Sequence, residues 1–200
     1  MAGKVFVISA PSGTGKTTLV YELLKQWNNK HKLKRVITYT TRCARKDEQD
    51  GKEYHFITRE DFEKKRKEHF FLEWSEYCGH FYGSPKSIVT EINEYEISFI
   101  LILDQDGARA VHAIPGIVLI WIMPPSLEEL AIRLAKRGKD SEADQIKRLE
   151  KAKTEMVREK KEHLYTFHLV NDHFLMTVSR LKSLIEGEIE EEDSSINKGK

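Results

Sequence analysis

Residues 9–18 read SAPSGTGKTT and directly follow the apolar run VFVI at residues 5–8. An apolar run in front of a glycine-rich turn predicts a buried strand that ends in the turn. The stretch matches the phosphate-binding pattern of Gly, four residues and Gly-Lys-Thr, with Ala10 in the place of the first glycine. A methyl group is tolerated there if φ stays negative, whereas Gly13 and Gly15 lie where the backbone must approach the ligand. The sequence therefore predicts a strand, a phosphate loop and a helix.

A loop of this kind aims backbone N–H groups and the positive end of a helix dipole at one point, where a phosphate fits. We expect Lys16 to reach the β- and γ-phosphates of a nucleotide and the Thr17 hydroxyl to bind Mg²⁺. The alternative is a chance Gly/Ser turn, but the intact Gly-Lys-Thr and the predicted flanking elements argue against it. The expected phosphate-binding residues are Ala10, Pro11, Ser12, Gly13, Thr14, Gly15, Lys16, Thr17 and Thr18.

Further apolar runs recur along the chain, around residues 36–37 and at residues 97–103, 117–123 and 167–170. Continuous runs rich in β-branched residues suit strands that are buried on both faces of a parallel sheet. Segments with a helical period lie between most of them, at residues 17–27, 85–95, 127–137 and 143–161. This alternation predicts an α/β fold whose central parallel sheet is flanked by helices on both sides.

Two segments interrupt the alternation. Residues 38–84 contain short aromatic-rich pieces and a charged helix candidate, which predicts a small inserted subdomain of short strands. The stretch RGKDSEAD at residues 137–144 is polar and suits a mobile flap between two helices. The like charges after residue 186 predict a frayed tail. We therefore divide the chain into a core of residues 1–37 and 85–186, an insert of residues 38–84 and a tail of residues 187–200.

The composition limits the possible partners. The 200 residues include 33 Lys and Arg and 32 Asp and Glu, so no overall field attracts nucleic acid or an anionic membrane. Cys43 and Cys78 are too few for a disulfide framework and have no metal-ligand spacing, which indicates reduced thiols in a cytosolic protein. The apolar runs are too short to span a bilayer. We expect a cytoplasmic monomer or weak homo-oligomer with no nucleic-acid or membrane partner.

The apolar run at residues 97–103 is followed by the carboxylates Asp104 and Asp106. Parallel sheets bind ligands at the carboxyl ends of their strands, so an acidic residue there is suited to a magnesium ion. We expect Asp104 to hold the ion through water. The alternative for either residue is a helix N-cap, a role in which aspartate is common.

A second anion site is indicated by TYTTRCARKDEQDGKEYHF at residues 38–56, which places Arg42 and Arg45 three positions apart, followed by Tyr54. Two guanidinium groups and a phenol form a good receptor for a dianionic phosphate. This pattern points to a phosphorylated acceptor, whereas an ATPase or GTPase switch would use water and would leave both arginines without a role.

The stretch FLEWSEYCGHFYGS at residues 71–84 supplies Glu73, Tyr82 and Ser84. A carboxylate can accept two parallel hydrogen bonds from guanine N1–H and its 2-amino group, and adenine offers no such pair. Glu73 is therefore a candidate for reading guanine.

Together these motifs resemble the guanylate kinase family, whose members phosphorylate GMP with ATP, over about residues 5–184. The matching pieces, in chain order, are the phosphate loop, Thr40-Thr41-Arg42 with Arg45, Gly51 and Tyr54-His55-Phe56, Phe71-Leu72-Glu73-Trp74 with Tyr82-Gly83-Ser84, Arg137-Gly138 with Arg148-Leu149, and HLVND at residues 168–172. The resemblance implies an α/β P-loop kinase with a central parallel sheet, an inserted small β-rich GMP-binding subdomain and a helical lid at about residues 126–160.

The resemblance also implies roles for particular residues. GMP would be bound by Thr38, Arg42, Arg45, Tyr54, Glu73, Tyr82, Gly83, Ser84 and Asp106, with Thr38, Glu73 and Asp106 at the guanine. ATP would be bound with Mg²⁺, and without any tight prosthetic group, by the loop and Asn171. The residues implied in catalysis are Lys16, Arg42, Arg137 and Arg148, the last two carried by the lid.

The chain departs from the family pattern at Ala44, Asp47 and the Gly107-Ala108-Arg109 segment. Two alternatives therefore stay open. One is a catalytically silent protein-binding module of the same fold, against which the intact loop and lid arginines argue. The other is a related kinase of another small phosphorylated acceptor, which would need no base-reading carboxylate.

Overall fold

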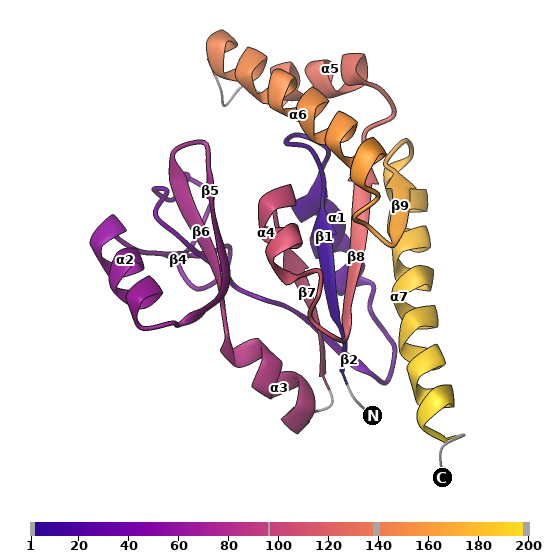
Figure 1. Ribbon diagram of the computed structural model, residues 1–200. Helices are drawn as coiled ribbons and strands as arrows, with labels where there is room; N and C mark the ends of the chain where they lie inside the picture. The colour runs from indigo at the N-terminus through magenta and orange to yellow at the C-terminus, as the bar shows by residue number, and fades with distance from the viewer. Residues whose placement is uncertain (1–2, 96, 138–140, 198–200) are drawn as a thin grey trace.

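The computed structural model describes residues 3–95, 97–137 and 141–197 of the chain, and its side chains except at 93–95, 137 and 192–197. A sheet of five parallel strands forms the centre of the molecule (Figure 1). The spatial order is β2-β7-β1-β8-β9, and β1 pairs with both β7 and β8. The strands are β1 (Val5–Ser9), β2 (Lys32–Arg35), β7 (Ile97–Ile102), β8 (Ile117–Met123) and β9 (Phe167–Val170). The predicted parallel sheet is confirmed.

The edge strand β2 lies at Lys32–Arg35, just before the strand predicted around residues 36–37. Only Leu33 of this strand is buried. The other three side chains are lysine and arginine, as is common on an edge strand. The backbone N–H of Val36 still donates to the Ile100 carbonyl at 2.9 Å, so the pairing continues into the predicted region. Continuous apolar runs indicate central strands, whereas an edge strand such as β2 has only one buried apolar residue.

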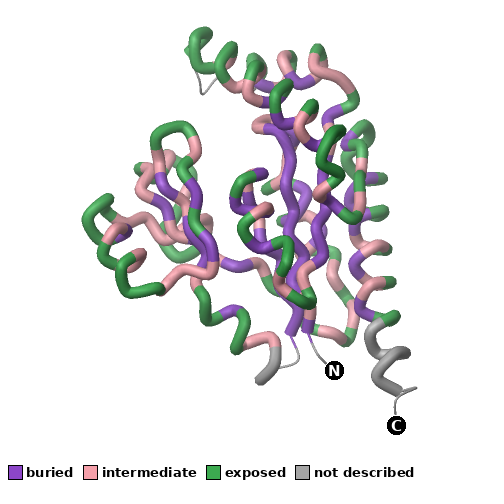
Figure 2. Tube along the Cα trace, in the orientation of Figure 1, coloured by how far each residue is buried: buried purple, intermediate pink, exposed green. Residues whose placement is uncertain are grey.

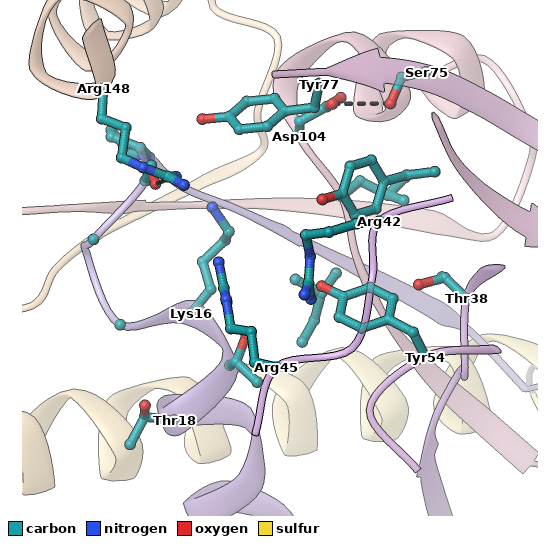
Figure 3. Close-up of a pocket in the computed structure, with 18 of the residues that line it drawn as sticks. Lys16, Thr18, Thr38, Arg42, Arg45, Tyr54, Ser75, Tyr77, Asp104 and Arg148 are labelled. Atoms are coloured by element: carbon teal, nitrogen blue, oxygen red, sulfur yellow. Dashed lines mark hydrogen bonds between the residues drawn. The ribbon is translucent and has the colours of Figure 1, made fainter. Parts of the chain in front are cut away.

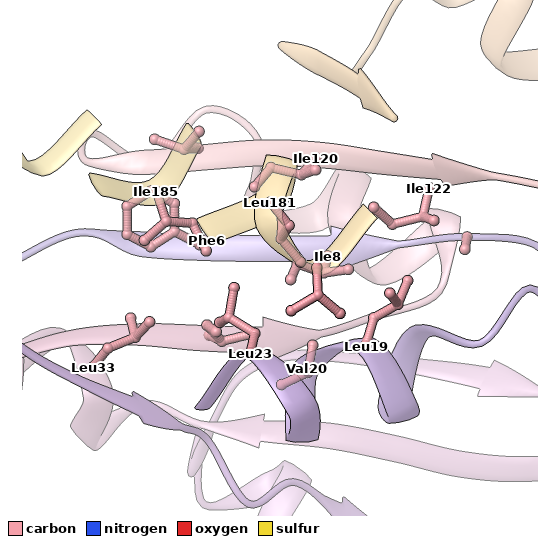
Figure 4. Packing of buried hydrophobic residues seen from close by; sticks show 14 of the residues in the cluster. Phe6, Ile8, Leu19, Val20, Leu23, Leu33, Ile120, Ile122, Leu181 and Ile185 are labelled. Atoms are coloured by element: carbon pink, nitrogen blue, oxygen red, sulfur yellow. The ribbon is translucent and has the colours of Figure 1, made fainter. Parts of the chain in front are cut away.

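Helices cover both faces of the sheet, and successive β1 residues alternate between the two cores. Phe6 and Ile8 face α1 (Lys16–Lys25) and α7 (Phe174–Asn197), as Figure 4 shows. Val5 and Val7 belong to the opposite core with α3 (Ser87–Tyr95) and α4 (Gln105–Val111). In Figure 2 the buried residues trace the strands between these layers. This two-sided burial explains why the central strands are continuous apolar runs.

The helix α7 corrects the expectation of a frayed tail from residue 187. It continues as regular helix to Asn197. Val178, Leu181, Ile185 and Ile189 are buried in the core at helical spacing, so the apolar period crosses the boundary predicted from the charges. The acidic residues between them, Glu186 and Glu188, are partly buried, and Glu188 pairs with Lys4 at 3.0 Å.

A second, four-stranded sheet lies beside the central one, with the order β4-β3-β6-β5. Its strands are β3 (Tyr39–Thr40), β4 (His55–Phe56), β5 (Phe71–Tyr77) and β6 (His80–Pro85), accompanied by α2 (Arg59–Lys67). Phe62 of α2 is fully buried and stacks on Phe71, with ring centroids 4.5 Å apart. The aromatic residues that marked this stretch in the sequence thus form its small core.

Two helices, α5 (Leu127–Arg137) and α6 (Glu142–Glu162), lie over the carboxyl ends of the central strands (Figure 1). The Ser141 hydroxyl caps α6 by accepting from the Asp144 N–H at 3.2 Å. Part of the stretch predicted as a flap, residues 138–140, lies outside the described residues. Within the described ranges, no helix combines the length and the apolar character needed to cross a membrane.

Candidate active site

A cavity of about 480 Å³ opens between the phosphate loop, the second sheet and α6 (Figure 3). Its wall combines residues from segments that are far apart in the sequence. The predicted site residues that line it are Pro11, Ser12, Gly13, Gly15, Lys16, Thr17, Thr18, Thr38, Arg42, Arg45, Tyr54, Glu73, Tyr82, Gly83, Asp104 and Arg148. The two regions predicted to bind phosphate therefore line the same cavity.

The phosphate loop connects β1 to α1 and depends on two glycines with positive φ. Gly13 has φ +92° and Gly15 has φ +99°, a region that L side chains rarely adopt. A Cβ on Gly13 would lie 2.7 Å from Leu134 Cδ2, so α5 packs directly on the loop. Gly15 is the N-cap of α1 and no side chain caps that end, which leaves its first N–H groups for a ligand.

The Lys16 side chain bonds back to the phosphate loop. Its ammonium group donates to the Ala10 carbonyl. Burial lowers the pKa of Lys16, and the negative charges of Glu155 and Asp104 oppose that shift. The sequence did not identify Glu155, a buried residue of α6 whose own pKa is raised to about 7 by burial. The arrangement places a cation where the phosphates of a nucleotide would lie.

Contacts from outside the loop fix its shape. The Asn171 side chain lies behind the loop and donates to the Thr14 carbonyl at 2.7 Å, so this residue supports the loop and does not line the cavity. From α6, Arg148 Nη1 donates to the Ser12 hydroxyl at 2.8 Å. The predicted lid arginine is therefore already at the loop. The side chain of the second one, Arg137, lies outside the described part of the structure.

At the predicted second phosphate site, both arginines form hydrogen bonds with Glu48, which was not predicted as a site residue. Arg42 makes two hydrogen bonds of 2.9 Å to Glu48, and the Arg45 backbone N–H donates to the same side chain at 2.8 Å. Burial alone would raise the pKa of Glu48, but these donors hold it below its ordinary value. The Arg42 guanidinium also lies 5.5 Å from the centre of the Tyr54 ring. Glu48 thus fixes the Arg42 side chain and the Arg45 backbone.

Glu73 lies on β5 with only 4% of its surface exposed. Its carboxylate accepts a hydrogen bond from the buried Ser84 hydroxyl on β6. Burial raises the pKa of Glu73 to about 7, although the hydrogen bond from Ser84 opposes the shift. A Cβ at Gly107 would lie 2.8 Å from Glu73 Oε2, so the glycine that departs from the family pattern makes room for this carboxylate.

The two aspartates after β7 lie in different surroundings, and only Asp104 lines the cavity. Asp104 is the N-cap of α4, accepting from the Gly107 N–H at 2.8 Å, and its other oxygen accepts from the Ser75 hydroxyl at 2.8 Å. Asp106 lies in the first turn of α4, with its side chain 59% exposed and paired with Arg158 at 2.7 Å. Because the helix begins at Gln105, Asp106 points away from the cavity. The placement therefore does not support its assignment to guanine, and Asp104 is the aspartate beside Glu73.

The residues at the loop fit a magnesium ion that arrives with a nucleotide. Thr17 and Asp104 line the same cavity, and each Asp104 oxygen has a lone pair beyond the bond it accepts. Among the described residues, no group of three or more His, Cys, Asp or Glu side chains could hold a metal by itself. A metal here would therefore share its coordination with phosphates and water.

Several lining residues were not predicted, namely Ser75, Tyr77, Ile102, Leu103 and Arg133. Ser75 and Tyr77 follow Glu73 at intervals of two on β5, so the period of the strand was a signal that could have identified them. Cys43 and Cys78, expected as reduced thiols, are free and exposed.

The comparisons with known proteins agree with this geometry. The family model described as guanylate kinase matches residues 2–188. A guanylate kinase of Nitrosospira multiformis is 40% identical over 187 residues, covering 93% of this chain and 86% of that protein. One of Dechloromonas aromatica is 39% identical over 188 residues, covering 92% and 89%. The crystal structure of guanylate kinase from Anaplasma phagocytophilum superposes with a TM-score of 0.76 at 30% identity, covering 94% of this chain and 86% of that one. Since the match extends over nearly the whole sequence and fold, the chain belongs to the guanylate kinase family.

Proposed function

We propose that this nucleoside monophosphate kinase transfers the γ-phosphoryl group of ATP reversibly to GMP, giving ADP and GDP, with Mg²⁺. One observation carries the proposal: a single cavity contains a phosphate loop, a separate pair of arginines and a buried carboxylate suited to guanine. Two anion sites facing one space suit transfer between two phosphorylated molecules. A water-using switch would need only one of them.

The proposed roles follow from charge and position. Lys16 neutralises the β- and γ-phosphates. Arg148, placed on the loop by its bond to Ser12, supplies positive charge where negative charge develops during transfer. Arg137 is proposed to act beside it. Arg42 and Arg45 hold the GMP phosphate so that its oxygen attacks in line. No general base is strictly required, because that phosphate is already anionic near neutral pH.

A bound magnesium ion would supply positive charge that stabilises the charge on the phosphate groups. We propose that the Thr17 hydroxyl holds the ion directly and that Asp104 holds it through water. The remaining GMP-binding roles are proposed for Thr38, Tyr54, Tyr82, Gly83 and Ser84. The first four line the same cavity as Glu73, and Ser84 donates a hydrogen bond to the Glu73 carboxylate.

We further propose that the insert of residues 38–84 and a lid at about residues 126–160 close over the core when substrates bind. Closure would exclude water and protect ATP from hydrolysis in the absence of GMP. We propose a cytoplasmic monomer or weak homo-oligomer that binds ATP and GMP. The near balance of charges supports the proposal that it has no nucleic-acid or membrane partner.

GMP binding is expected to release a proton from Glu73. In the empty protein this carboxyl has a pKa of about 7. Two hydrogen bonds from guanine favour the ionised form and lower the pKa, so binding strengthens as pH rises toward about 7 and levels off above it. Titration calorimetry at pH 6.5 in buffers of different ionisation enthalpy measures the release.

The GMP phosphate has a second pKa of about 6, so it also contributes to the pH dependence of binding. The control is therefore E73Q, which keeps the phosphate contribution and lacks the carboxyl. Equal proton release by the two proteins would remove Glu73 from the guanine site. Failure of the native protein to bind GMP at any of these pH values would contradict the proposed function itself.

A further inference from the structure

Tyr77 lines the cavity from β5, but the proposed reaction gives it no role. The Lys151 ammonium of α6 lies 3.4 Å from the centre of the Tyr77 ring. The phenol itself meets the phosphate loop: burial raises the pKa of Tyr77, and a hydrogen bond with the Ser12 hydroxyl opposes the shift. In Figure 3 the Tyr77 hydroxyl points toward the side of the cavity from which Arg148 projects. This side chain of the insert thus contacts both the phosphate loop and α6.

The residues of α6 that meet these segments share one face of the helix. Arg148, Lys151 and Glu155 are spaced by three and four positions, which places them in line. Arg148 donates to the Ser12 hydroxyl at 2.8 Å, and Lys151 covers the Tyr77 ring. Further along, the Glu155 backbone carbonyl accepts from the Gln105 side chain at 3.3 Å. This face of α6 is therefore seated against the phosphate loop, β5 and α4.

We propose, on the basis of the kinase function above, that Tyr77 is a positioning residue that fixes α6 against the phosphate loop and thereby places Arg148 for the transfer. Tyr77 acts through Arg148 and need not touch either substrate. A cation over a partly buried ring is a stronger contact than an exposed one, because water competes less for the ammonium group. An arginine that is already oriented loses less freedom in the transition state, so the contact raises kcat more than it affects GMP binding.

Two single variants and their combination test the proposal. Y77L removes the ring and the hydroxyl, and K151M removes the cation but keeps the length of the side chain. Each is expected to lower kcat about tenfold while KM for GMP stays within about twofold. The double variant is expected to be no slower than either single one, because both changes remove the same contact. Since Lys151 is only partly buried, K151M keeps the test valid if Y77L misfolds.

A matched control is available on the same strand. Trp74 lies on β5 under a different cation, with the Arg66 guanidinium 4.8 Å from its ring, and it does not line the cavity. W74L therefore removes an aromatic ring and a cation–π contact of the same kind from the opposite face of the strand. Its kcat is expected to equal that of the native protein.

Hydrogen exchange of the α6 amides in the nucleotide-free protein gives a readout that does not depend on activity. Y77L and K151M are expected to raise exchange across residues 142–162 about tenfold, and W74L is expected to leave it unchanged. Unchanged exchange in both folded variants, or effects on kcat that multiply in the double variant, would overturn the proposal. Because exchange needs no acceptor, a native protein that is inactive with GMP would contradict the proposed function and still leave this measurement decisive for Tyr77.

Discussion

K16M is expected to lower kcat/KM by about 10³-fold or more with little change in thermal stability. Methionine has a similar length but no charge, so the β- and γ-phosphates lose the cation that the first turn of α1 supplies. Folding should be largely unaffected, because burial already disfavours the Lys16 ammonium and lowers its pKa. Steady-state kinetics with ATP and GMP, together with a melting curve, measure both effects.

The control for K16M is K25M, a change of the same chemistry in the last turn of the same helix, where Lys25 is exposed. It is expected to keep native kinetics. Near-native activity of K16M with a native melting curve would remove Lys16 from the mechanism and with it the assignment of the loop.

E73Q is expected to raise KM for GMP by about 10²-fold and to weaken the preference for GMP over AMP. A carboxylate accepts from both guanine N1–H and the 2-amino group, whereas glutamine presents an amide N–H₂ to one of these donors. The Arg42 and Arg45 contacts to the phosphate are untouched, so kcat at saturating GMP should fall far less. Kinetics with GMP and AMP as separate acceptors measure the change in selectivity.

The same substitution has an opposite effect on stability. The pKa of Glu73 is higher in the folded protein than in the unfolded chain, so folding loses stability as pH rises from about 4.5 to about 7. E73Q avoids this loss and is expected to unfold no more easily than the native protein at pH 8. E76Q, an exposed position on the same strand, serves as the control for both measurements. An unchanged preference for GMP in folded E73Q would contradict the base-reading role.

The phosphate loop could be predicted from the sequence because its chemistry is local. The turn, the lysine and the threonine follow one another, and β1 and α1 each have a clear period. The same holds for Arg42 and Arg45, which lie three positions apart in one segment and line the same cavity. Spacing along the chain is then nearly equivalent to position in space.

Features that depend on distant contacts were not accessible in this way. The directions of the Asp104 and Asp106 side chains depend on where α4 begins. That start is set by the two hydrogen bonds that Asp104 accepts, from the Gly107 N–H and from the Ser75 hydroxyl. The helical course of the C-terminal segment depends on burial of Ile189 against the sheet, which charge counting cannot detect. Glu48 stands among charged neighbours in the sequence and acquires its role only when Arg42 folds back onto it.

The most direct test of the central claim is ADP release from ATP and Mg²⁺, measured in parallel with GMP, AMP, CMP, UMP and no acceptor. The account predicts rapid turnover with GMP and little with the other nucleotides or with water. Comparable turnover with AMP, or no turnover with any acceptor by folded protein that binds GMP, would contradict it.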